Sequence, residues 1–327
     1  MSQSPPHALD FLILGAGAMG TIFGAYLARA GHSVAMLVRE RRAEQIRTGG
    51  LRVTGLEDFT VQVPVLTDAS QLRRAGVLIV AMKTLGTAAA LGPLRHVHFD
   101  GVLSLQNGAF KNDRLVEAFG RHAVIGALSD ASGELRPDGS VLFTRNVMTL
   151  VGDLEGDGAR ATELAGVLER AGIRTRAVPD ITGREWSKFC GWAGYMTMAV
   201  ATRAVSWKVV LDPDGARLIA RVAREMAALA AARGITLSDD SMLPIVSMAR
   251  GTEEEAAAAV VRKNEAMQAT APLHRMSSLQ DFEAGRPLEL EETVAVALRE
   301  GHAHDVPMPT LEALYLLCRT LQRIQQK

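Results

Sequence analysis

The residues near the start of the chain that are best suited to chemistry form a glycine-rich loop, Gly15-Ala16-Gly17-Ala18-Met19-Gly20. The loop follows the apolar run Leu9–Leu14 and begins the helix-like run Met19–Ala30. In that setting Gly15 permits a tight turn, Gly17 lets the backbone approach a pyrophosphate, and Gly20 lets helix and strand pack closely. The helix N-terminus adds free N–H groups and a partial positive charge. We therefore predict that these six residues bind a dinucleotide; the alternative is a glycine turn in a similar domain that binds no ligand.

A basic cluster after the second apolar run indicates which dinucleotide binds. The run ends in Leu37-Val38-Arg39 and continues into Glu40, Arg41 and Arg42. NAD-binding domains usually place an acidic residue there, which holds the ribose 2′-hydroxyl, whereas a guanidinium suits a 2′-phosphate. We predict NADP(H), with Arg39 as the first contact and Arg42 as a candidate second one. The alternatives are a solvated basic helix start, or NAD if the strand ends one residue later, at Glu40.

The first half of the chain alternates short apolar runs with helix-like runs, which is typical of a parallel sheet covered by helices. The turn sequence Pro137-Asp138-Gly139-Ser140 interrupts this pattern and predicts an antiparallel hairpin, followed by a separate strand. A smaller hairpin is predicted around Gly55. The predicted strands are Leu9–Leu14, Ser33–Val38, Leu51–Thr54, Thr60–Val65, Val77–Ala81, Val102–Gln106, Val124–Leu128, Gly133–Arg136, Val141–Arg145, Met148–Val151 and Ile173–Val178.

After Pro179 the pattern becomes helical, and no further strand is predicted. Asp212-Pro213 supplies an N-cap and a proline at the first helical position, and Glu253-Glu254-Glu255 favours another helix start. We predict an α/β fold class. A Rossmann-like doubly wound sheet binds NADP(H) in residues 1–179, and an all-helical substrate and catalytic domain follows in residues 180–327. The predicted helices are Met19–Ala30, Ala159–Ala171, Ile181–Ala204, Pro213–Arg233, Glu291–Glu300 and Thr310–Gln326.

The composition excludes several classes of protein. The 327 residues include 36 basic and 36 acidic side chains, so no net field attracts nucleic acid or an anionic membrane. No run approaches the ~20 apolar residues of a membrane span, and Met1–Asp10 lacks the pattern of a secretion signal. Two cysteines, Cys190 and Cys318, indicate a reducing compartment, and we expect a cytoplasmic protein. The patterns His96-x-His98 and His302-x-His304-Asp305 are too sparse to predict a metal site.

Three further motifs follow one another along the chain. Ala81-Met82-Lys83 ends one predicted strand, Gln106-Asn107-Gly108 ends the next, and Trp186-Ser187-Lys188 lies in the first long helix of the second half. Together with the glycine loop, their order and spacing resemble the ketopantoate reductase family, the 2-dehydropantoate 2-reductases, over nearly the whole chain. A later stretch resembles that family's last motif: Ser277-Ser278-Leu279-Gln280-Asp281, then Gly285-Arg286 and Glu289.

The resemblance implies an NADPH-dependent oxidoreductase that transfers hydride to the C2 carbonyl of a small 2-oxo acid substrate. By position, Lys188 is the general acid, and Glu289 helps to hold and orient it. Asn107 contacts the nicotinamide side of the cofactor, Lys83 lies close to nicotinamide and substrate, and Ser277 hydrogen-bonds the substrate carboxylate. An ammonium suits this chemistry because negative charge grows on the carbonyl oxygen as hydride arrives. Each position also has an ordinary alternative, as a solvated charge, a turn asparagine or a capping serine.

Two positions in the long helix depart from the family pattern. Four and eight residues after Lys188 the family has asparagines, and this chain has Trp192 and Met196. The three side chains share one helix face, so we predict that they contact the substrate together. A substrate hydroxyl left without its amide partner costs about 1–3 kcal/mol, which favours a bulkier, more apolar carbonyl substrate over ketopantoate. The alternative is that Trp192 and Met196 pack in the core, and that Tyr195 or Thr197 serves the substrate.

Other hypotheses stay open on the sequence alone. A family member without the two asparagines could bind NADPH as a non-catalytic regulator. Hydroxyisobutyrate-type dehydrogenases also combine a glycine loop with a lysine on a helix. Their lysine is followed three residues later by an asparagine, and in this chain that position is Gly191. Cys190 lies two residues from Lys188, whose ammonium could lower the thiol pKa; the alternative is a packed cysteine. The alanine- and methionine-rich helices allow packing against a second copy, so a homodimer is one expected state.

Overall fold

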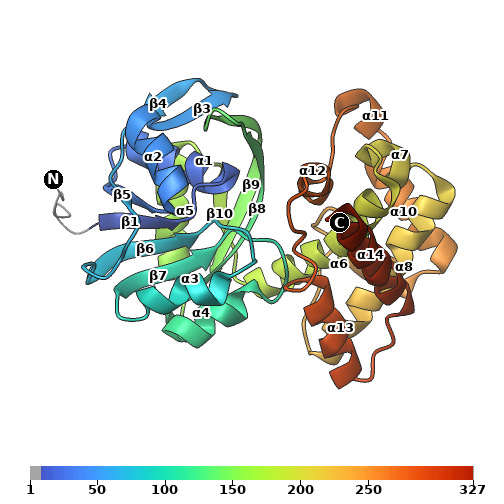
Figure 1. Cartoon of the computed structure of the whole chain (residues 1–327). Helices are drawn as coiled ribbons and strands as arrows, with labels where there is room; N and C mark the ends of the chain where they lie inside the picture. The colour runs from blue at the N-terminus through green and yellow to red at the C-terminus, as the bar shows by residue number, and fades with distance from the viewer. Residues whose placement is uncertain (1–8, 327) are drawn as a thin grey trace. The chain divides into compact units, whose positions relative to one another are not determined.

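The computed structural model describes residues 9–326 (Figure 1). It divides the chain into two compact units, one ending at Ile181 and the other beginning at Thr182. Within the described residues, every strand lies in the first unit, and the second unit is built from helices. The predicted fold class, a parallel α/β sheet followed by a helical region, is therefore confirmed.

A five-stranded parallel sheet forms the centre of the first unit. Its strand order is β5 (Val65–Leu66), β2 (Val34–Leu37), β1 (Leu9–Leu14), β6 (Arg74–Val80) and β7 (His98–Ser104). The register pairs Leu37 with Leu14, Leu14 with Val80, and Val80 with Ser104. The carboxyl ends of these four strands therefore lie in one row along the same edge of the sheet. Ligands bind at this edge in open α/β sheets.

Helices cover both faces of the parallel sheet, so its strands are buried on both sides. Phe11 and Ile13 of β1 belong to one core cluster, and Leu12 and Leu14 belong to another. This alternation follows from the two-residue period of a strand. The helices of the first unit are α1 (Ala18–Arg29), α2 (Glu40–Gly49), α3 (Thr87–Leu91), α4 (Lys111–Phe119) and α5 (Ala159–Ala171), with 3₁₀ turns at Gly92–Leu94 and Arg121–Ala123.

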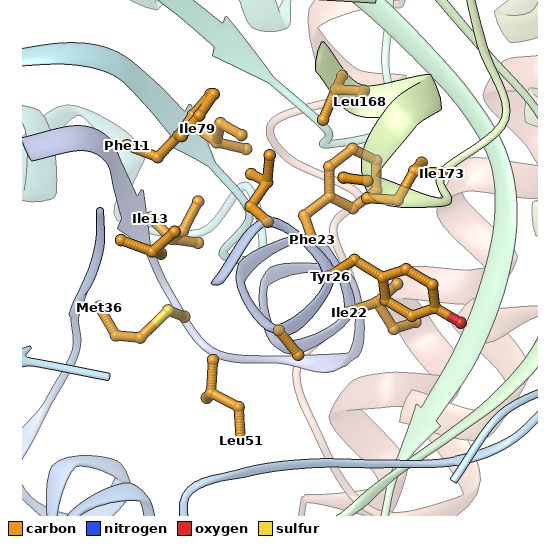
Figure 2. Close-up of a cluster of buried hydrophobic side chains, with 14 of the residues drawn as sticks. Phe11, Ile13, Ile22, Phe23, Tyr26, Met36, Leu51, Ile79, Leu168 and Ile173 are labelled. Carbon is orange, nitrogen blue, oxygen red and sulfur yellow. The ribbon is translucent and has the colours of Figure 1, made fainter. Parts of the chain in front are cut away.

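Helix α1 lies at the centre of the larger core cluster. Figure 2 shows Phe23 and Tyr26 of α1 among side chains from β1, from α5 and from Ile173. Every residue from Gly20 to Leu27 is buried, so α1 is enclosed by protein rather than amphipathic. Burial of each large apolar side chain contributes about 1.5–3 kcal/mol. The helix that begins at the glycine loop is thus one of the most firmly held elements of the unit.

A second sheet flanks α1 and contains both predicted hairpins. Its order is β10 (Thr175–Ala177), β9 (Val141–Asp153), β3 (Leu51–Gly55) and β4 (Phe59–Val61), and β8 (Ile125–Leu135) also pairs with β9. The prediction of a separate strand at Met148–Val151 was wrong. That segment continues β9, because the antiparallel ladder with β8 runs from Asp153 to Val141 and absorbs its irregularities in register shifts near Ser129 and Ser132.

The smaller hairpin also differs from its prediction. The strand predicted at Thr60–Val65 is split into β4, which pairs with β3, and β5, which joins the parallel sheet. Pro64 lies between them, and proline has no N–H to continue a ladder. The carbonyl of Pro64 still accepts a hydrogen bond from the Met36 N–H at 3.0 Å, which guides the chain into β5.

The second unit consists of nine helices within the described residues. The bounds are α6 (Ile181–Thr202), α7 (Ser206–Val210), α8 (Pro213–Ala232), α9 (Ile245–Arg250), α10 (Glu253–Asn264), α11 (Met267–Thr270), α12 (Ser277–Glu283), α13 (Val294–Ala303) and α14 (Pro309–Gln325). The Asp212 carboxylate caps α8, and Thr252 and Glu255 form a reciprocal capping box on α10. The helix predicted from Glu291 begins three residues later, at Val294, because Glu291 is used in a tertiary contact described below.

Helix α6 is the central helix of the second unit. All residues from Phe189 to Val200 are buried, as expected for a helix that is packed against neighbours on every side. None of the helices in the part of the chain that the structure describes is long and apolar enough to cross a lipid bilayer.

Candidate active site

Three loops at the carboxyl edge of the parallel sheet carry predicted site residues. Gly17, Lys83 and Asn107 each lie three residues beyond the ends of β1, β6 and β7. Those strand ends are paired residue for residue, so the loops leave the sheet at the same level. The structure therefore brings the glycine loop and two of the later motifs to one edge of the first unit.

The three glycines of the loop are needed for different reasons. Gly15 has a φ of +97°, and a Cβ there would lie 2.8 Å from the Met82 side chain. At Gly20 a Cβ would come within 2.0 Å of the Gly15 carbonyl oxygen. A Cβ on Gly17, by contrast, would approach only the Ala81 carbonyl, at 3.9 Å. The protein's own packing requires Gly15 and Gly20, whereas the space beside Gly17 is open to a ligand.

The first turn of α1 suits a phosphate group. Gly17 is the N-cap residue, no side chain caps the helix, and the first turn contains no acidic residue. The N–H groups there keep their capacity to donate, and the helix dipole adds partial positive charge. Together with the open space at Gly17, these features fit the pyrophosphate of a dinucleotide. The residues that would hold it are those of the predicted loop, Gly15 to Gly20.

Arg39 lies beside this loop, at the start of α2. Its side chain is exposed and makes no hydrogen bond or ion pair to any residue that the structure describes. Its neighbour Glu40 instead pairs with Arg47 at 2.6 Å. The guanidinium of Arg39 is therefore the group at this strand end that can meet a ribose 2′-phosphate, while the carboxylate that would favour NAD is engaged elsewhere.

The guanidinium of Arg42, the candidate second phosphate contact, is hydrogen-bonded within the protein. Its Nε donates to the Ala16 carbonyl at 3.0 Å, and its Nη2 donates to the Thr21 hydroxyl at 3.1 Å. Its Nη1 reaches the Gly139 carbonyl at 3.0 Å, in the turn between β8 and β9. Burial lowers the pKa of this guanidinium, and the three contacts offset its desolvation. Arg42 thus fixes the glycine loop to the hairpin turn.

The two residues on the neighbouring loops differ in burial. Lys83 is exposed, and Asn107 is half-buried. The side-chain amide of Asn107 makes no hydrogen bond to the described residues and is available to a ligand. The backbone of the Lys83 loop is held by Gln106, which comes immediately before Asn107.

Lys188 lies near the start of α6, in the second unit. Its side chain is partly exposed, although its neighbours Ser187 and Phe189 are buried. The Ser187 hydroxyl donates to the Gly183 carbonyl at 2.7 Å and accepts a hydrogen bond from the Ser238 N–H at 2.9 Å. These contacts fix the rotation of the helix at this turn, so the direction in which Lys188 leaves α6 is set by packing.

Trp192 and Met196 follow Lys188 on the same face of α6. Only 5% of Trp192 and 1% of Met196 is exposed, and the Trp192 ring stacks on Phe189 with centroids 5.7 Å apart. Both side chains therefore also serve as core residues of the second unit, and any substrate contact they make is through an apolar surface.

Tyr195 and Thr197, the alternative candidates for contacting the substrate, are already hydrogen-bonded within the protein. The Asn264 amide donates to the Tyr195 hydroxyl at 2.7 Å, and burial raises the pKa of Tyr195 to about 12. The Thr197 hydroxyl donates to the Ala193 carbonyl at 2.8 Å, within α6. Both are buried side chains with internal partners. This arrangement disfavours the idea that either residue serves the substrate.

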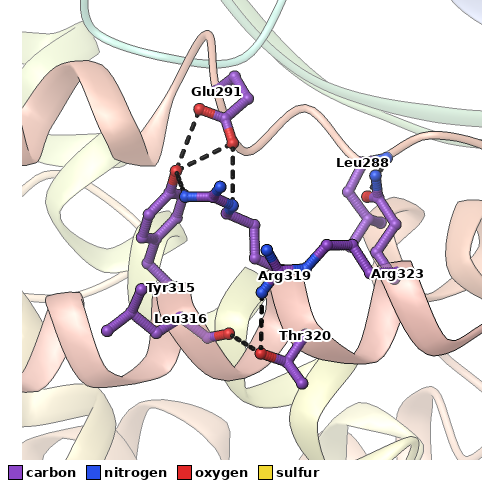
Figure 3. Close-up of polar contacts among 8 residues, drawn as sticks. Leu288, Glu291, Tyr315, Leu316, Arg319, Thr320 and Arg323 are labelled. Atoms are coloured by element: carbon purple, nitrogen blue, oxygen red, sulfur yellow. Dashed lines mark hydrogen bonds and ion pairs between the residues drawn. The ribbon is translucent and has the colours of Figure 1, made fainter.

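Glu289 is buried in a segment that is fixed at both ends. On one side, the Leu288 N–H donates to the Gln322 side chain of α14 at 2.9 Å. On the other, the Tyr315 hydroxyl donates to Glu291 at 2.9 Å, and Arg319 completes the cluster (Figure 3). Burial and the Glu291 contact raise the pKa of Tyr315, so its hydroxyl stays protonated as a donor. Helix α14 thus positions the segment that carries Glu289.

The remaining late-motif residues lie on α12. Ser277 is the first residue of this helix and is exposed. Ser278 is buried, and its hydroxyl has no hydrogen-bond partner among the described residues. Asp281 pairs with Arg286 at 2.8 Å, which closes the turn that follows the helix. In this motif the Asp281–Arg286 pair closes the turn, and the polar side chains that are exposed to a ligand are those of Ser277 and Arg286.

Two further kinds of chemistry are a reactive cysteine and a metal site. Cys190 is fully buried, and burial raises the pKa of its thiol, which favours the packed cysteine over the reactive one. Over residues 9–326, no cluster of histidine, cysteine and carboxylate side chains has the geometry to hold a metal ion.

Two family models of the same enzymes match successive parts of the chain. The model for ketopantoate reductase PanE/ApbA matches residues 11–156, and the model for the C-terminal part of the same enzymes matches residues 180–322. The chain belongs to the ketopantoate reductase family. It is an oxidoreductase of that family, and its cofactor is NADP(H), as the sequence predicted.

Relatives and solved structures agree with this assignment. A 2-dehydropantoate 2-reductase of Archaeoglobus fulgidus is 29% identical over 314 residues, which cover 95% of this reductase and 97% of the relative. One from Mycobacterium tuberculosis is 28% identical and covers 94% and 96%. The crystal structure of a ketopantoate reductase from Ralstonia eutropha matches with a TM-score of 0.81 and 25% identity, over 97% of this chain and all of that one. A D-mandelate dehydrogenase shares the fold at 19% identity, with a TM-score of 0.84 over 97% of this chain and all of that one.

Proposed function

We propose that this reductase converts the C2 ketone of a 2-oxo acid to the 2-hydroxy acid, with NADPH as hydride donor and Lys188 as general acid. The observation that carries the proposal is the common edge at which the open glycine loop, Lys83 and Asn107 meet. In this proposal residues 1–179 bind the cofactor, and residues 180–327 bind the substrate. We also propose that the protein is cytoplasmic and forms a homodimer.

The chemistry needs one hydride and one proton. NADPH, when bound, supplies the hydride to the C2 carbon. The ammonium of Lys188 stabilises the negative charge that grows on the carbonyl oxygen and then gives that oxygen a proton. Glu289, whose segment is held by α14, helps to hold and orient the lysine, and Ser277 donates a hydrogen bond to the substrate carboxylate. Solvent then returns a proton to the Lys188 amine.

The substrate's side chain is the part that this chain treats differently. Trp192 and Met196 offer an indole and a thioether where asparagines would serve a hydroxyl. A polar group placed against them without a partner loses about 1–3 kcal/mol, so an apolar or aromatic tail fits better than that of ketopantoate. The solved D-mandelate dehydrogenase holds NADH and anilino(oxo)acetate, so the shared fold accommodates an oxoacetate that carries an aryl group.

The test follows NADPH absorbance with ketopantoate and with phenylglyoxylate, an aromatic 2-oxo acid, each at saturating concentration. We expect turnover of both classes, with the higher kcat/KM for the aromatic acid. Lys188→Ala should lower kcat by about 10²–10⁴-fold while the Kd for NADPH changes little. Lys208→Ala, which removes an exposed lysine of α7, is the matched control and should leave kcat unchanged. Near-normal turnover by Lys188→Ala would refute the assignment of the general acid.

A non-catalytic role is the second candidate, because both asparagines of the family pattern are missing. It predicts tight NADPH binding with no turnover of any 2-oxo acid. Under that outcome Lys188→Ala and Lys208→Ala would be indistinguishable in every assay of the purified protein.

A further inference from the structure

Gln106 occupies a buried position between two loops that the proposed reaction uses. It lies directly before Asn107, at the end of β7, and only 9% of it is exposed. The last ladder bond between the two strands is the one from the Leu105 N–H to the Val80 carbonyl, at 2.9 Å. Beyond that bond β6 and β7 separate, and they continue into the loop with Lys83 and the loop with Asn107.

The side chain of Gln106 connects these loops where the sheet no longer does. Its Nε2 donates to the Lys83 carbonyl at 3.2 Å and to the Thr87 hydroxyl at 2.8 Å. Thr87 is the first residue of α3, so the amide holds both the middle and the far end of the Lys83 loop. The Thr87 hydroxyl in turn donates to the Thr84 carbonyl at 2.7 Å, inside the same loop.

A serine fixes which way this amide faces. The Ser104 hydroxyl donates to the Gln106 Oε1 at 3.0 Å, and the same hydroxyl accepts the Gln106 backbone N–H at 3.2 Å. Since Oε1 accepts the Ser104 hydroxyl and the Lys83 carbonyl can only accept, the NH₂ group must face Lys83 and Thr87. The donors and the acceptor of the side chain are all satisfied, and a buried network of that kind specifies one arrangement.

We propose that Gln106 is a positioning residue of this reductase, which fixes the distance between Lys83 and Asn107 by hydrogen-bonding the Lys83 loop to the end of β7. The inference rests on the proposed function, in which Lys83 and Asn107 meet the nicotinamide and the substrate. Gln106 itself contacts neither ligand. Its effect is on rate, because a shift of about 1 Å in a reacting group can change the rate about 10²-fold.

The first test replaces the amide by a side chain of similar length without polar atoms. Gln106→Leu should lower kcat/KM for the 2-oxo acid by about 10- to 100-fold, mostly through kcat. Thr87→Val removes one bond of the network and should cause a smaller loss of turnover, whereas Thr87→Ser keeps the hydroxyl and should restore it. Thr175→Val is the control. It deletes another buried hydroxyl of the first unit, which donates to the Ile173 carbonyl at 2.7 Å, and it should leave kcat unchanged.

A double-mutant cycle separates positioning from a general structural effect. If Gln106 acts by placing Lys83, then Gln106→Leu made in a Lys83→Ala background should cost less than about threefold further, because the group to be placed is gone. Losses that multiply in the double variant would overturn the proposal, as would wild-type turnover by Gln106→Leu. Should Gln106→Leu fail to fold, the Thr87→Val and Thr87→Ser pair is put through the same cycle.

The hydrogen bonds of Gln106 to Lys83 and Thr87 form a clamp between the two loops. Hydrogen–deuterium exchange tests this clamp without relying on turnover. Amides of residues 82–87 should exchange at least tenfold faster in Gln106→Leu than in the wild type, and Thr175→Val should leave them unchanged. Equal exchange in Gln106→Leu and the wild type would overturn the proposal even in an active enzyme. Faster exchange in a protein that reduces no 2-oxo acid would show that the clamp exists and that the proposed function is at fault.

Discussion

At the scale of single residues, Gly17 and Gly20 lie three positions apart and differ in what a methyl group would meet. Alanine at Gly17 meets only the Ala81 carbonyl, at 3.9 Å, whereas alanine at Gly20 would lie 2.0 Å from the Gly15 carbonyl. We expect Gly17→Ala to leave the melting temperature of the free protein unchanged and to weaken NADPH binding at least about tenfold. Gly20→Ala should destabilise the free protein by about 1–3 kcal/mol or more, because packing must shift. Fluorescence titration with NADPH and thermal melts of both variants check this. A Gly17→Ala protein with normal NADPH affinity would contradict a role for the glycine loop in binding the pyrophosphate.

Arg39 is the residue that we predict to select NADPH over NADH. A hydrogen bond to a charged group contributes about 1.5–3 kcal/mol, which corresponds to roughly 10- to 100-fold in affinity. Arg39→Ala should therefore raise the Kd for NADPH by about that factor while the Kd for NADH changes less than about twofold. Arg41→Ala, an exposed arginine two positions on, is the control. Equal weakening of both cofactors in Arg39→Ala would mean that Arg39 does not contact the 2′-phosphate.

At the scale of elements, α2 is connected to the glycine loop through Arg42. Its guanidinium donates to Ala16 and Thr21 on one side and to Gly139 on the other. Arg42→Met keeps the apolar stem but leaves two carbonyls without that donor, which costs about 1–3 kcal/mol each when they are buried. We expect a lower melting temperature together with weaker NADPH binding. Arg47→Met, which breaks an exposed ion pair on the same helix, should change stability by less than about 1 kcal/mol. Unaltered NADPH affinity in Arg42→Met would show that the loop keeps its shape without the arginine.

The contact between α1 and the β3–β4 turn gives the fold an acid-sensitive point. The hydrogen bond from Arg29 holds the pKa of Glu57 below its ordinary value of 4.5. The folded state therefore favours the ionised carboxylate, and the stability this gives is present above pH 4.5 and lost as pH falls through the lowered folded pKa. Glu57→Gln should melt below the wild type at neutral pH, and the difference should shrink on acidification below about pH 4.5. Glu44→Gln serves as an exposed control, and a difference that is constant with pH would contradict this role.

The sequence predicted those elements whose signals are local. The run Leu9–Leu14 became β1 with the same bounds, and Asp212-Pro213 began α8 as expected. The elements that differed depend on long-range pairing. β9 runs on through Met148–Val151 because β8 supplies a partner along its whole length, and no local pattern encodes that length. The split at Pro64 was available in the sequence, since proline interrupts a ladder.

At the scale of the whole molecule, the candidate site was predictable as a set of residue types but not as a network. Glycine spacing and the ends of apolar runs identified the edge where Gly17, Lys83 and Asn107 meet. The hydrogen bonds that hold these loops could not be predicted, because they join residues that are far apart in the sequence. Arg42 and Gly139 are 97 residues apart, and Gln106 and Lys83 are 23 apart. Arginine and glutamine have no spacing rule that indicates such partners, so their roles emerge only once strands are paired.

The tryptophans of the chain distinguish the unfolding of one unit from that of the other. The three tryptophans, Trp186, Trp192 and Trp207, all belong to the second unit, so tryptophan fluorescence reports on that unit alone. Each unit is compact, and the first has core clusters of its own. We therefore expect calorimetry to resolve two transitions, one of which is absent from the fluorescence melt.

NADP⁺ should move only the transition of the first unit, because the glycine loop lies there. At 100 times its Kd a ligand stabilises the folded state by about 2.7 kcal/mol, which raises the melting temperature of a unit of this size by roughly 5–10 °C. The fluorescence melt should not follow that shift, and Gly17→Ala should lose most of it. If NADP⁺ raises the melting temperature seen by fluorescence as much as the one seen by calorimetry, the units unfold as a single cooperative body. Cofactor binding would then stabilise the helical unit as well.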